Sequence, residues 1–354
     1  MIATPVQNFP RLVEAVQRNC DISDARYGRD MTLCTYLLEM RELYCWEHEL
    51  PLTALPPKEE LGSWLSERET LWGTMEETPF EPLPVGGREL DPFDAPAINA
   101  ELEPEGLVYG GGYGRFHRPQ FFLGQLERRD RREGLEVLVV GCEYARGLSA
   151  PPAAFQNGSV FVRQDALRRW LWEKVELWGT RQSGGAMQSA LSCYGFDRDP
   201  LGALDRMTHE ETESVILHEL GEGRAETLLG PSWKEMLASL RGKRAEILAR
   251  AVRDNLADCL STLPALIERG AAAPIHFYFA NFEGMRRHLF PQLVAAYRLW
   301  REDADTAPLL DAIGEGREHW QDAARRLMAL HVEPQGAEPG IETLAAREPS
   351  PLTL

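Results

Sequence analysis

The sequence predicts a mainly α-helical protein, a helical bundle with a small two-stranded β element near its middle. Apolar residues recur at helical spacing through most of the chain, and only two short runs have the apolar, β-branched character of strands. These runs are residues 135–140 and 159–163. Two short strands predict a hairpin or minor sheet packed on helices, and they argue against a doubly wound fold.

The totals predict an ordinary globular protein with two or three packed regions. Its 354 residues are 44% hydrophobic and 26% charged, with a net charge of −17. Such an acidic surface argues against nucleic-acid and anionic-membrane partners, which require a basic field. No run approaches the roughly 18 apolar residues of a membrane-spanning helix. A small-molecule substrate remains the expected class of partner, and nothing indicates an oligomeric state.

The cysteines and the N-terminus predict a cytoplasmic setting. The six cysteines are scattered, with no Cys-x-x-Cys pair and no short metal-ligand spacing. The first ten residues have neither the basic region nor the apolar run of a signal peptide. Free thiols in a reducing compartment are therefore expected.

Residues 1–78 are predicted to form an N-terminal helical unit. A first helix spans 9–19, and a polar turn covers 20–30. The second helix, capped by Asp30, runs to about residue 47, and a third follows the prolines at 51, 56 and 57. The inward stripe expected of the second helix consists of Leu33, Leu37, Met40 and Tyr44.

Residues 79–200 are predicted to be an irregular and small β region with one main helix, at 164–178. The glycine-rich segment 109–117 lacks the Gly-Lys-Ser/Thr of a phosphate loop, so a flexible loop or strand edge is expected there. A short helix is expected at about 119–132, before the first strand. Residues 180–200 are interpreted as a connector.

Residues 201–332 are predicted to be a C-terminal helical bundle, followed by a disordered tail at 333–354 rich in Pro, Glu and Gly. Proline positions and apolar stripes divide the bundle into helices. Their expected ranges are 208–226, 232–261 (ended by Pro264), 274–290, 292–301 and 308–331.

The first of these helices carries the candidate site. Thr208 is the expected N-cap, with Glu211 closing a capping box. At about 100° per residue, Glu211, His218 and Glu222 share a sector of roughly 40°. An imidazole and a carboxylate one turn apart, as in His218 and Glu222, can bind one divalent metal. The alternative is an ordinary solvated acidic face.

Two later helices add candidate ligands. Asp254 and Asp258 lie one turn apart beside an apolar face, and His276 lies on a helix that is apolar nearly all round. Pairing of the aspartates with arginines, and a buried core role for the histidine, are the simpler interpretations. Together, however, the residues match the ligands of non-haem iron or manganese sites in helical bundles. The predicted ligands are His218, Glu222, Asp254, Asp258 and His276.

The functional hypothesis is a metal-binding protein, with a mono-iron or di-iron oxidase of a small molecule as its sharpest form. Iron is the expected cofactor, and manganese and zinc are possible. Glu219 is expected either to hold a metal ligand in place by a hydrogen bond or to act as a general base. The Glu-x-x-His pair of ferritin-like proteins is absent.

Two alternatives stay open. The segment His-Glu-x-x-Glu, residues 218–222, resembles an incomplete zinc-hydrolase motif, in which the second His is replaced by Glu222. A non-catalytic helical scaffold or interaction protein is the other alternative. Its aspartates would pair with nearby arginines, the candidates being Arg146, Arg224, Arg250 and Arg253.

The chain also resembles a known family. The resemblance rests on the segments Asn19–Arg26, Thr32–Glu42, Gly141–Pro152 and His218–Glu222. They are similar to an uncharacterised family of bacterial cytosolic proteins, a domain of unknown function, over most of the chain. This resemblance implies a bacterial source and a single-family architecture, and it transfers no activity or catalytic residue.

Overall fold

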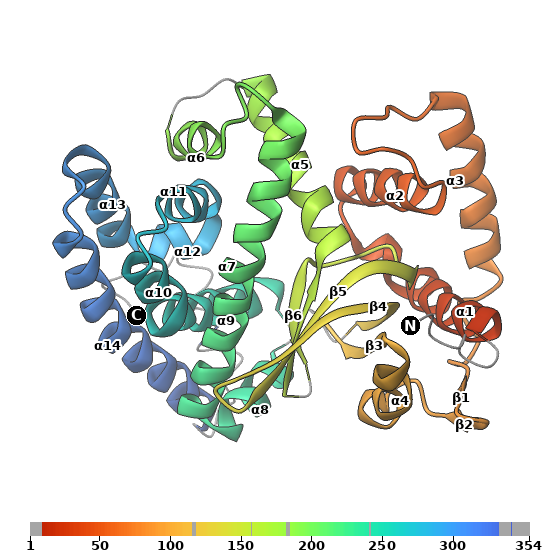
Figure 1. Cartoon of the computed structure of the whole chain (residues 1–354). Coiled ribbons are helices and arrows are strands. Elements are labelled where there is room, and N and C mark those ends of the chain that lie inside the picture. Colours follow the sequence, from red (N-terminus) through yellow and green to blue (C-terminus); the bar gives the residue numbers. More distant parts are fainter. Residues whose placement is uncertain are drawn as a thin grey trace. The chain divides into compact units, whose positions relative to one another are not determined.

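The structure is a computed structural model that describes residues 9–114, 118–156, 158–181, 185–240, 242–332 and 341. The chain divides into two compact units, Met1–Trp172 and Glu173–Leu354 (Figure 1). Every described helix is too short or too polar to cross a lipid bilayer. The predicted tail lies outside the described residues except for position 341.

Three helices begin the first unit: α1 (Phe9–Tyr27), α2 (Leu33–Glu47) and α3 (Lys58–Gly73). The polar turn predicted at 20–30 is wrong, because α1 continues through the buried residues Cys20 and Ile22. Thr32, not Asp30, caps α2, since its hydroxyl accepts the backbone N–H of Thr35 at 3.3 Å.

The predicted inward stripe of α2 is only half correct. Met40 and Tyr44 are buried, as expected. Leu33 and Leu37 are exposed instead, to 71% and 47%. The buried face of α2 therefore begins at Tyr36 and runs toward the C-terminal half of the helix.

The sheet is much larger than the predicted two-stranded element. Its five strands have the order β3-β4-β5-β7-β6. The pair β5 and β7 is parallel and the other pairs are antiparallel, so the sheet is mixed. The strands are β3 (Leu107–Tyr113), β4 (Pro119–Arg132), β5 (Leu135–Arg146), β6 (Ala153–Gln156) and β7 (Ser159–Arg163). A separate hairpin of β1 (Leu83–Val85) and β2 (Arg88–Leu90) precedes α4 (Ala95–Leu102) and a 3₁₀ turn (Glu103–Glu105).

The helix predicted at 119–132 is wrong, because these residues form β4. The stretch from 127 to 132 consists of charged residues, several of them good helix formers, which misled the prediction. Its burial alternates residue by residue, as in a strand, and it pairs along its length with β5. Pairing with the strongly apolar β5 overrides local propensity here.

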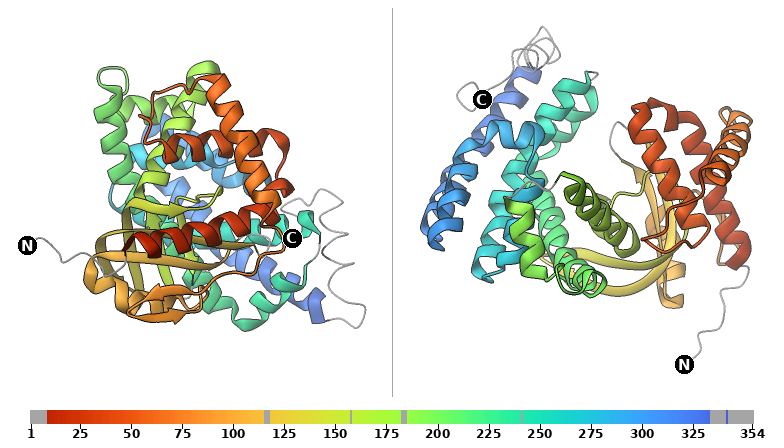
Figure 2. Two further views of the ribbon diagram at one scale, coloured as in Figure 1. Left: turned by 90° about the vertical axis from the view of Figure 1, so that its right-hand side faces the viewer. Right: turned by 90° about the horizontal axis from the view of Figure 1, so that it is seen from above.

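The two faces of the sheet pack differently. Helix α1 lies across one face of the sheet (Figure 2). Its Leu12 and Val16 belong to the same buried apolar cluster as Phe121 and Leu123 of β4. The other face carries a separate apolar cluster formed by Val108, Phe122, Leu138, Val140 and Phe161. The core of the first unit is therefore double-sided.

The glycine-rich segment is a strand edge, one of the two structures expected for it, in the part that is described. Strand β3 is an outer strand, and a Cβ on its Gly110 would lie 1.9 Å from the ring of Phe122. Glycine is required there because the aromatic ring lies directly on the backbone. Residues 115–117, with His117, lie outside the described residues.

All of the regular secondary structure in the described part of the second unit is helical. It begins within α5 (Gln164–Arg181), which crosses the boundary at Trp172. The remaining helices are α6 (Ala186–Tyr194), α7 (Pro200–Leu229), α8 (Pro231–Ser239), α9 (Lys243–Ala257), a π-helical turn (Asp258–Thr262), α10 (Leu263–Glu268), α11 (Ala272–Asn281), α12 (Gly284–Leu289), α13 (Pro291–Asp303) and α14 (Ala307–Val332).

Several helix ends differ from the prediction. Helix α7 begins eight residues before Thr208, because Asp199 accepts the N–H of Gly202 at 3.1 Å and Pro200 occupies the first position. Thr208 lies inside the helix and donates to the carbonyl of Leu204. The helix expected at 232–261 is divided into α8, α9 and the π-helical turn, and Pro264 lies in the first turn of α10 instead of ending a helix.

Candidate functional site

The candidate site lies where α7 meets the C-terminal end of α9 and the π-helical turn. Gly221 permits this contact, since a Cβ at this position would lie 2.4 Å from the carbonyl oxygen of Ala257. The π-helical turn begins at Asp258, directly after that carbonyl. Single π-helical turns within α-helices occur frequently at functional sites.

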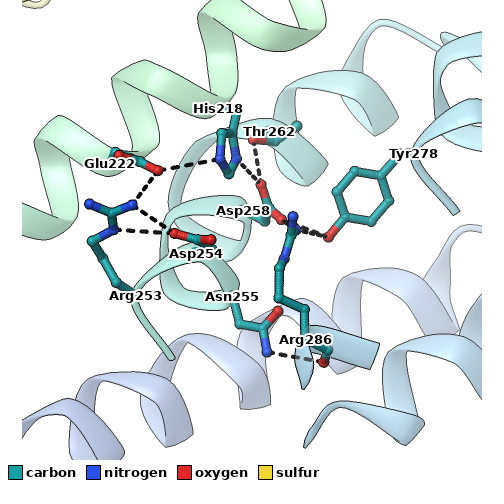
Figure 3. A network of polar contacts seen from close by, with 9 residues as sticks. All are labelled: His218, Glu222, Arg253, Asp254, Asn255, Asp258, Thr262, Tyr278 and Arg286. Carbon is teal, nitrogen blue, oxygen red and sulfur yellow. Dashed lines mark hydrogen bonds and ion pairs between the residues drawn. The ribbon is translucent and has the colours of Figure 1, made fainter. Parts of the chain in front are cut away.

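Asp258 is the centre of the polar network in Figure 3. Its Oδ1 lies 2.7 Å from Nδ1 of His218 and accepts a hydrogen bond from the Thr262 hydroxyl at 2.9 Å. Its Oδ2 accepts from the Tyr278 hydroxyl at 2.8 Å and from the guanidinium of Arg286. The carboxylate is only 1% exposed, so protein groups replace its hydration.

A second carboxylate cluster faces the other nitrogen of the same histidine. Nε2 of His218 lies 3.5 Å from Oε1 of Glu222. The guanidinium of Arg253 donates to that same oxygen at 2.5 Å and to Oδ1 of Asp254 at 2.9 Å (Figure 3). One potential ligand atom each from His218, Glu222 and Asp254 lies within 4.8 Å of the others.

The charges in this network are coupled. Burial alone would lower the pKa of His218, but the charge and hydrogen bond of Asp258, together with Glu222, raise it well above its ordinary value. Burial would raise the pKa of Asp258, whereas Arg286 and His218 lower it to about 2. Burial opposes the ionisation of Glu222, but its polar neighbours, Arg253 first among them, together favour it more strongly. The pKa of Glu222 is therefore lowered. The network is therefore a set of buried, mutually neutralising ions.

Two further glutamates on α7 are buried, contrary to the solvated face considered above. Burial and the charge of Glu222 raise the pKa of Glu219. Burial also raises the pKa of Glu211 to about 8. Oε1 of Glu211 accepts a hydrogen bond from the Tyr194 hydroxyl at 2.8 Å, more than two helical turns from Glu222. The acidic side of α7 therefore faces protein at both positions.

The structure brings together four of the five predicted ligands. His218 contacts Glu222 and Asp258 directly, and Asp254 joins through Arg253. His276 makes different contacts: its Nδ1 lies 2.9 Å from the Tyr297 hydroxyl, and its ring packs on Trp300. Burial and Arg301 lower the pKa of His276.

Sequence reasoning missed several members of the network. Arg253 was named as a candidate partner of the aspartates, and it does pair with Asp254. Its burial and its bond to Glu222, across the contact between α7 and α9, were not foreseen. Thr262 was not singled out, although it follows Asp258 by one turn. Tyr278 and Arg286 come from α11 and α12, and no spacing in the sequence connects them to Asp258.

Comparison with protein families covers nearly the whole chain. Residues 11–163 match the N-terminal domain of a family of unknown function, DUF6866, and residues 168–348 match the C-terminal domain of the same family. The chain belongs to the DUF6866 family. This confirms the expected resemblance to a domain of unknown function. The network around His218 lies entirely in the DUF6866 C-terminal domain. No curated protein and no solved structure matches the chain.

Proposed function

We propose that the C-terminal domain binds one divalent transition-metal ion through His218, Glu222 and Asp254. The observation that carries the proposal is the convergence of one imidazole nitrogen and two carboxylate oxygens within 4.8 Å of one another. Three protein ligands of this kind would leave coordination positions for water or substrate, as in catalytic metal sites.

The hydrogen bond of Asp258 supports a ligand role for His218. Metal-binding histidines usually donate the second ring N–H to a carboxylate, which fixes the tautomer and the ring orientation. Asp258 holds Nδ1 of His218 at 2.7 Å, and Nε2 faces Glu222. This refines the predicted ligand set: Asp258 orients His218, and His276 takes no part in the proposed site.

The carboxylates of Glu222 and Asp254 have enough lone pairs to bind both Arg253 and a metal. The bonds from Arg253 reach Oε1 of Glu222 and Oδ1 of Asp254. A carboxylate has two oxygens and about four lone-pair directions, so an arginine and a metal can share it. The donor set fits the ion, and the guanidinium is a competing cation that lowers its affinity.

The chemistry of the donors defines the class of metal. One imidazole with two carboxylates suits iron, manganese or zinc more than copper or calcium. With iron or manganese, the function that follows is oxidation of a small molecule. With zinc, it is hydrolysis, for which Glu219 is the candidate base. The ion would supply Lewis-acid or redox chemistry, and the protein residues would orient it and exclude water.

A second function has its own supporting observation. Arg253 and Arg286, together with a protonated His218, can neutralise the carboxylates of Glu222, Asp254 and Asp258. Such a network can fix the contact between α7, α9 and α12 without any metal, as in a helical scaffold. Buried ion networks of this kind serve specificity more than stability.

Measuring the metal content of the protein distinguishes the metal-binding function from the helical scaffold. The full chain, purified aerobically and anaerobically, is analysed by elemental mass spectrometry for Fe, Mn and Zn, and Co²⁺ is titrated into the metal-free protein. We expect near-stoichiometric metal and a tetrahedral or five-coordinate Co²⁺ spectrum. His218→Ala and Asp254→Asn should each reduce affinity at least tenfold, because each removes a ligand.

His209→Ala is the matched control, because His209 is an exposed histidine on the same helix. It should retain the metal of the parent protein. Substoichiometric metal in every preparation, together with no Co²⁺ spectrum, would refute the metal site and leave the scaffold.

A further inference from the structure

The first unit contains a cavity of about 620 Å³ beside its five-stranded sheet. The cavity lies on the face of the sheet that carries Leu126, Leu138 and Phe161. Its volume falls within the range of roughly 300–1,000 Å³ that is typical of small-molecule sites. All of its lining residues belong to the first unit, so it is separate from the network around His218.

The curl of the sheet forms this cavity. Strand β4 has register shifts between Leu123 and Arg128, and such bulges bend a strand and increase its twist. The two outer strands, β3 and β6, approach each other in consequence: the side chain of Gln156 lies 3.7 Å from the Cβ position of Gly112. Strands that are distant in the order of the sheet thus face the same space.

Helix α4, which packs beside β3 (Figure 1), forms another wall. The side-chain amide of Asn99 donates to the carbonyl of Tyr109 at 2.8 Å and accepts its N–H at 2.7 Å. These two bonds fix the helix on the outer strand, so the wall is in place without a ligand. Pro96 and Ala100 line the cavity one turn apart, and their small side chains leave it open.

The charges that line the cavity are paired with one another. Arg129 of β4 lies 2.7 Å from Glu103 and 2.6 Å from Glu136. One guanidinium between two carboxylates leaves a net negative charge, which repels anions. The apolar floor offers no compensation for a buried ion. Gln156 and Ser159 supply neutral hydrogen-bonding groups.

We propose that this cavity binds an uncharged small molecule that has an apolar part and at least one hydrogen-bonding group. Its apolar body lies on Leu126, Leu138 and Phe161, and its polar group bonds to Gln156 or Ser159. This site is independent of the metal site proposed above.

Two fluorescent probes with the same ring skeleton test the proposal on the full chain. N-phenyl-1-naphthylamine is neutral, and 8-anilinonaphthalene-1-sulfonate adds one negative charge. We expect the neutral probe to bind with enhanced emission and the anionic probe to bind at least tenfold more weakly. Ala100→Phe fills the cavity and should weaken the neutral probe at least tenfold.

Glu105→Phe is the matched control, since it places the same ring at an exposed position of the same segment, outside the cavity lining. It should bind the probe as the parent does. Pro104→Phe, at another exposed lining position, repeats the test if Ala100→Phe does not fold. No emission from the parent, or equal loss in both the filling variant and the control, overturns the site. Equal binding of both probes overturns the assignment of an uncharged ligand.

Discussion

At the scale of single residues, the burial of Glu211 has a consequence for the pH dependence of stability. The ordinary pKa of its carboxyl is 4.5, and in the folded protein it is about 8. The folded state therefore holds a proton that the unfolded state has released between these two values. The stabilisation from this group is complete below pH 4.5 and is lost as the pH rises through 8.

Glu211→Gln tests this linkage, because glutamine keeps a carbonyl acceptor for the Tyr194 hydroxyl and does not ionise. As the pH is raised from 5 to 8, the parent should lose stability that the variant keeps. The free energy of unfolding of the variant minus that of the parent should therefore increase by on the order of 1–3 kcal/mol. Urea denaturation at several pH values measures it. The exposed neighbour Glu210→Gln serves as the control, and the same rise there would contradict the assignment.

The sequence located the candidate site around His218 but not the residues that surround it. Helical periodicity placed His218 and Glu222 on one face, and it placed Asp254 with Asp258 on another helix, because that spacing depends only on local geometry. It could not show that Glu211 and Glu219 are buried, since burial depends on which helices cover α7. It could not find Arg286 for the same reason: the contact with Asp258 crosses 28 residues and two helices.

At the scale of the secondary-structure elements, the contact between α7 and the π-helical turn depends on Gly221. A Cβ there would lie 2.4 Å from the backbone oxygen of Ala257, and backbone cannot move aside as a flexible side chain can. Gly221→Ala should therefore destabilise the protein by about 1–3 kcal/mol, although alanine is the better helix former. It should also weaken metal binding, because it separates His218 from Asp258.

Gly314→Ala in α14 provides the opposite case, since nothing lies within 4 Å of its Cβ position. This variant should be more stable than the parent by about 0.5–1 kcal/mol, as expected for glycine replaced in a helix interior. Thermal and urea denaturation of both variants give the comparison. Equal effects of the same sign at the two positions would show that helix propensity, not the close approach, controls stability.

The same scale explains where the prediction of elements failed. Strands β5 and β7 were recognised because their apolar runs are strong, whereas β4 was predicted as a helix. The second half of β4 consists largely of Arg, with one Glu and one Asp, and cross-strand partners such as Glu136 for Arg129 stabilise these charges. A single sequence contains the charges but not the strand that faces them.

At the scale of the whole molecule, each unit has its own core. The apolar clusters around Leu12, Val108 and Met40 lie in the first unit, and the large cluster around Trp233 and Trp320 lies in the second. The two family domains, residues 11–163 and 168–348, divide the chain near the same place. Because each unit has its own core, we expect a destabilising substitution in one unit to leave the stability of the other unchanged.

Two leucine truncations test this separation. Leu123→Ala in β4 and Leu293→Ala in α13 each remove a side chain that is 0% exposed, at a cost of about 2–5 kcal/mol. Hydrogen exchange followed by mass spectrometry should show that Leu123→Ala lowers protection within residues 9–156 and leaves 200–330 unchanged. Leu293→Ala should give the reverse pattern. If either variant lowers protection in both units, the two units unfold as one cooperative structure. The boundary at Trp172 would then not separate two independently stable units.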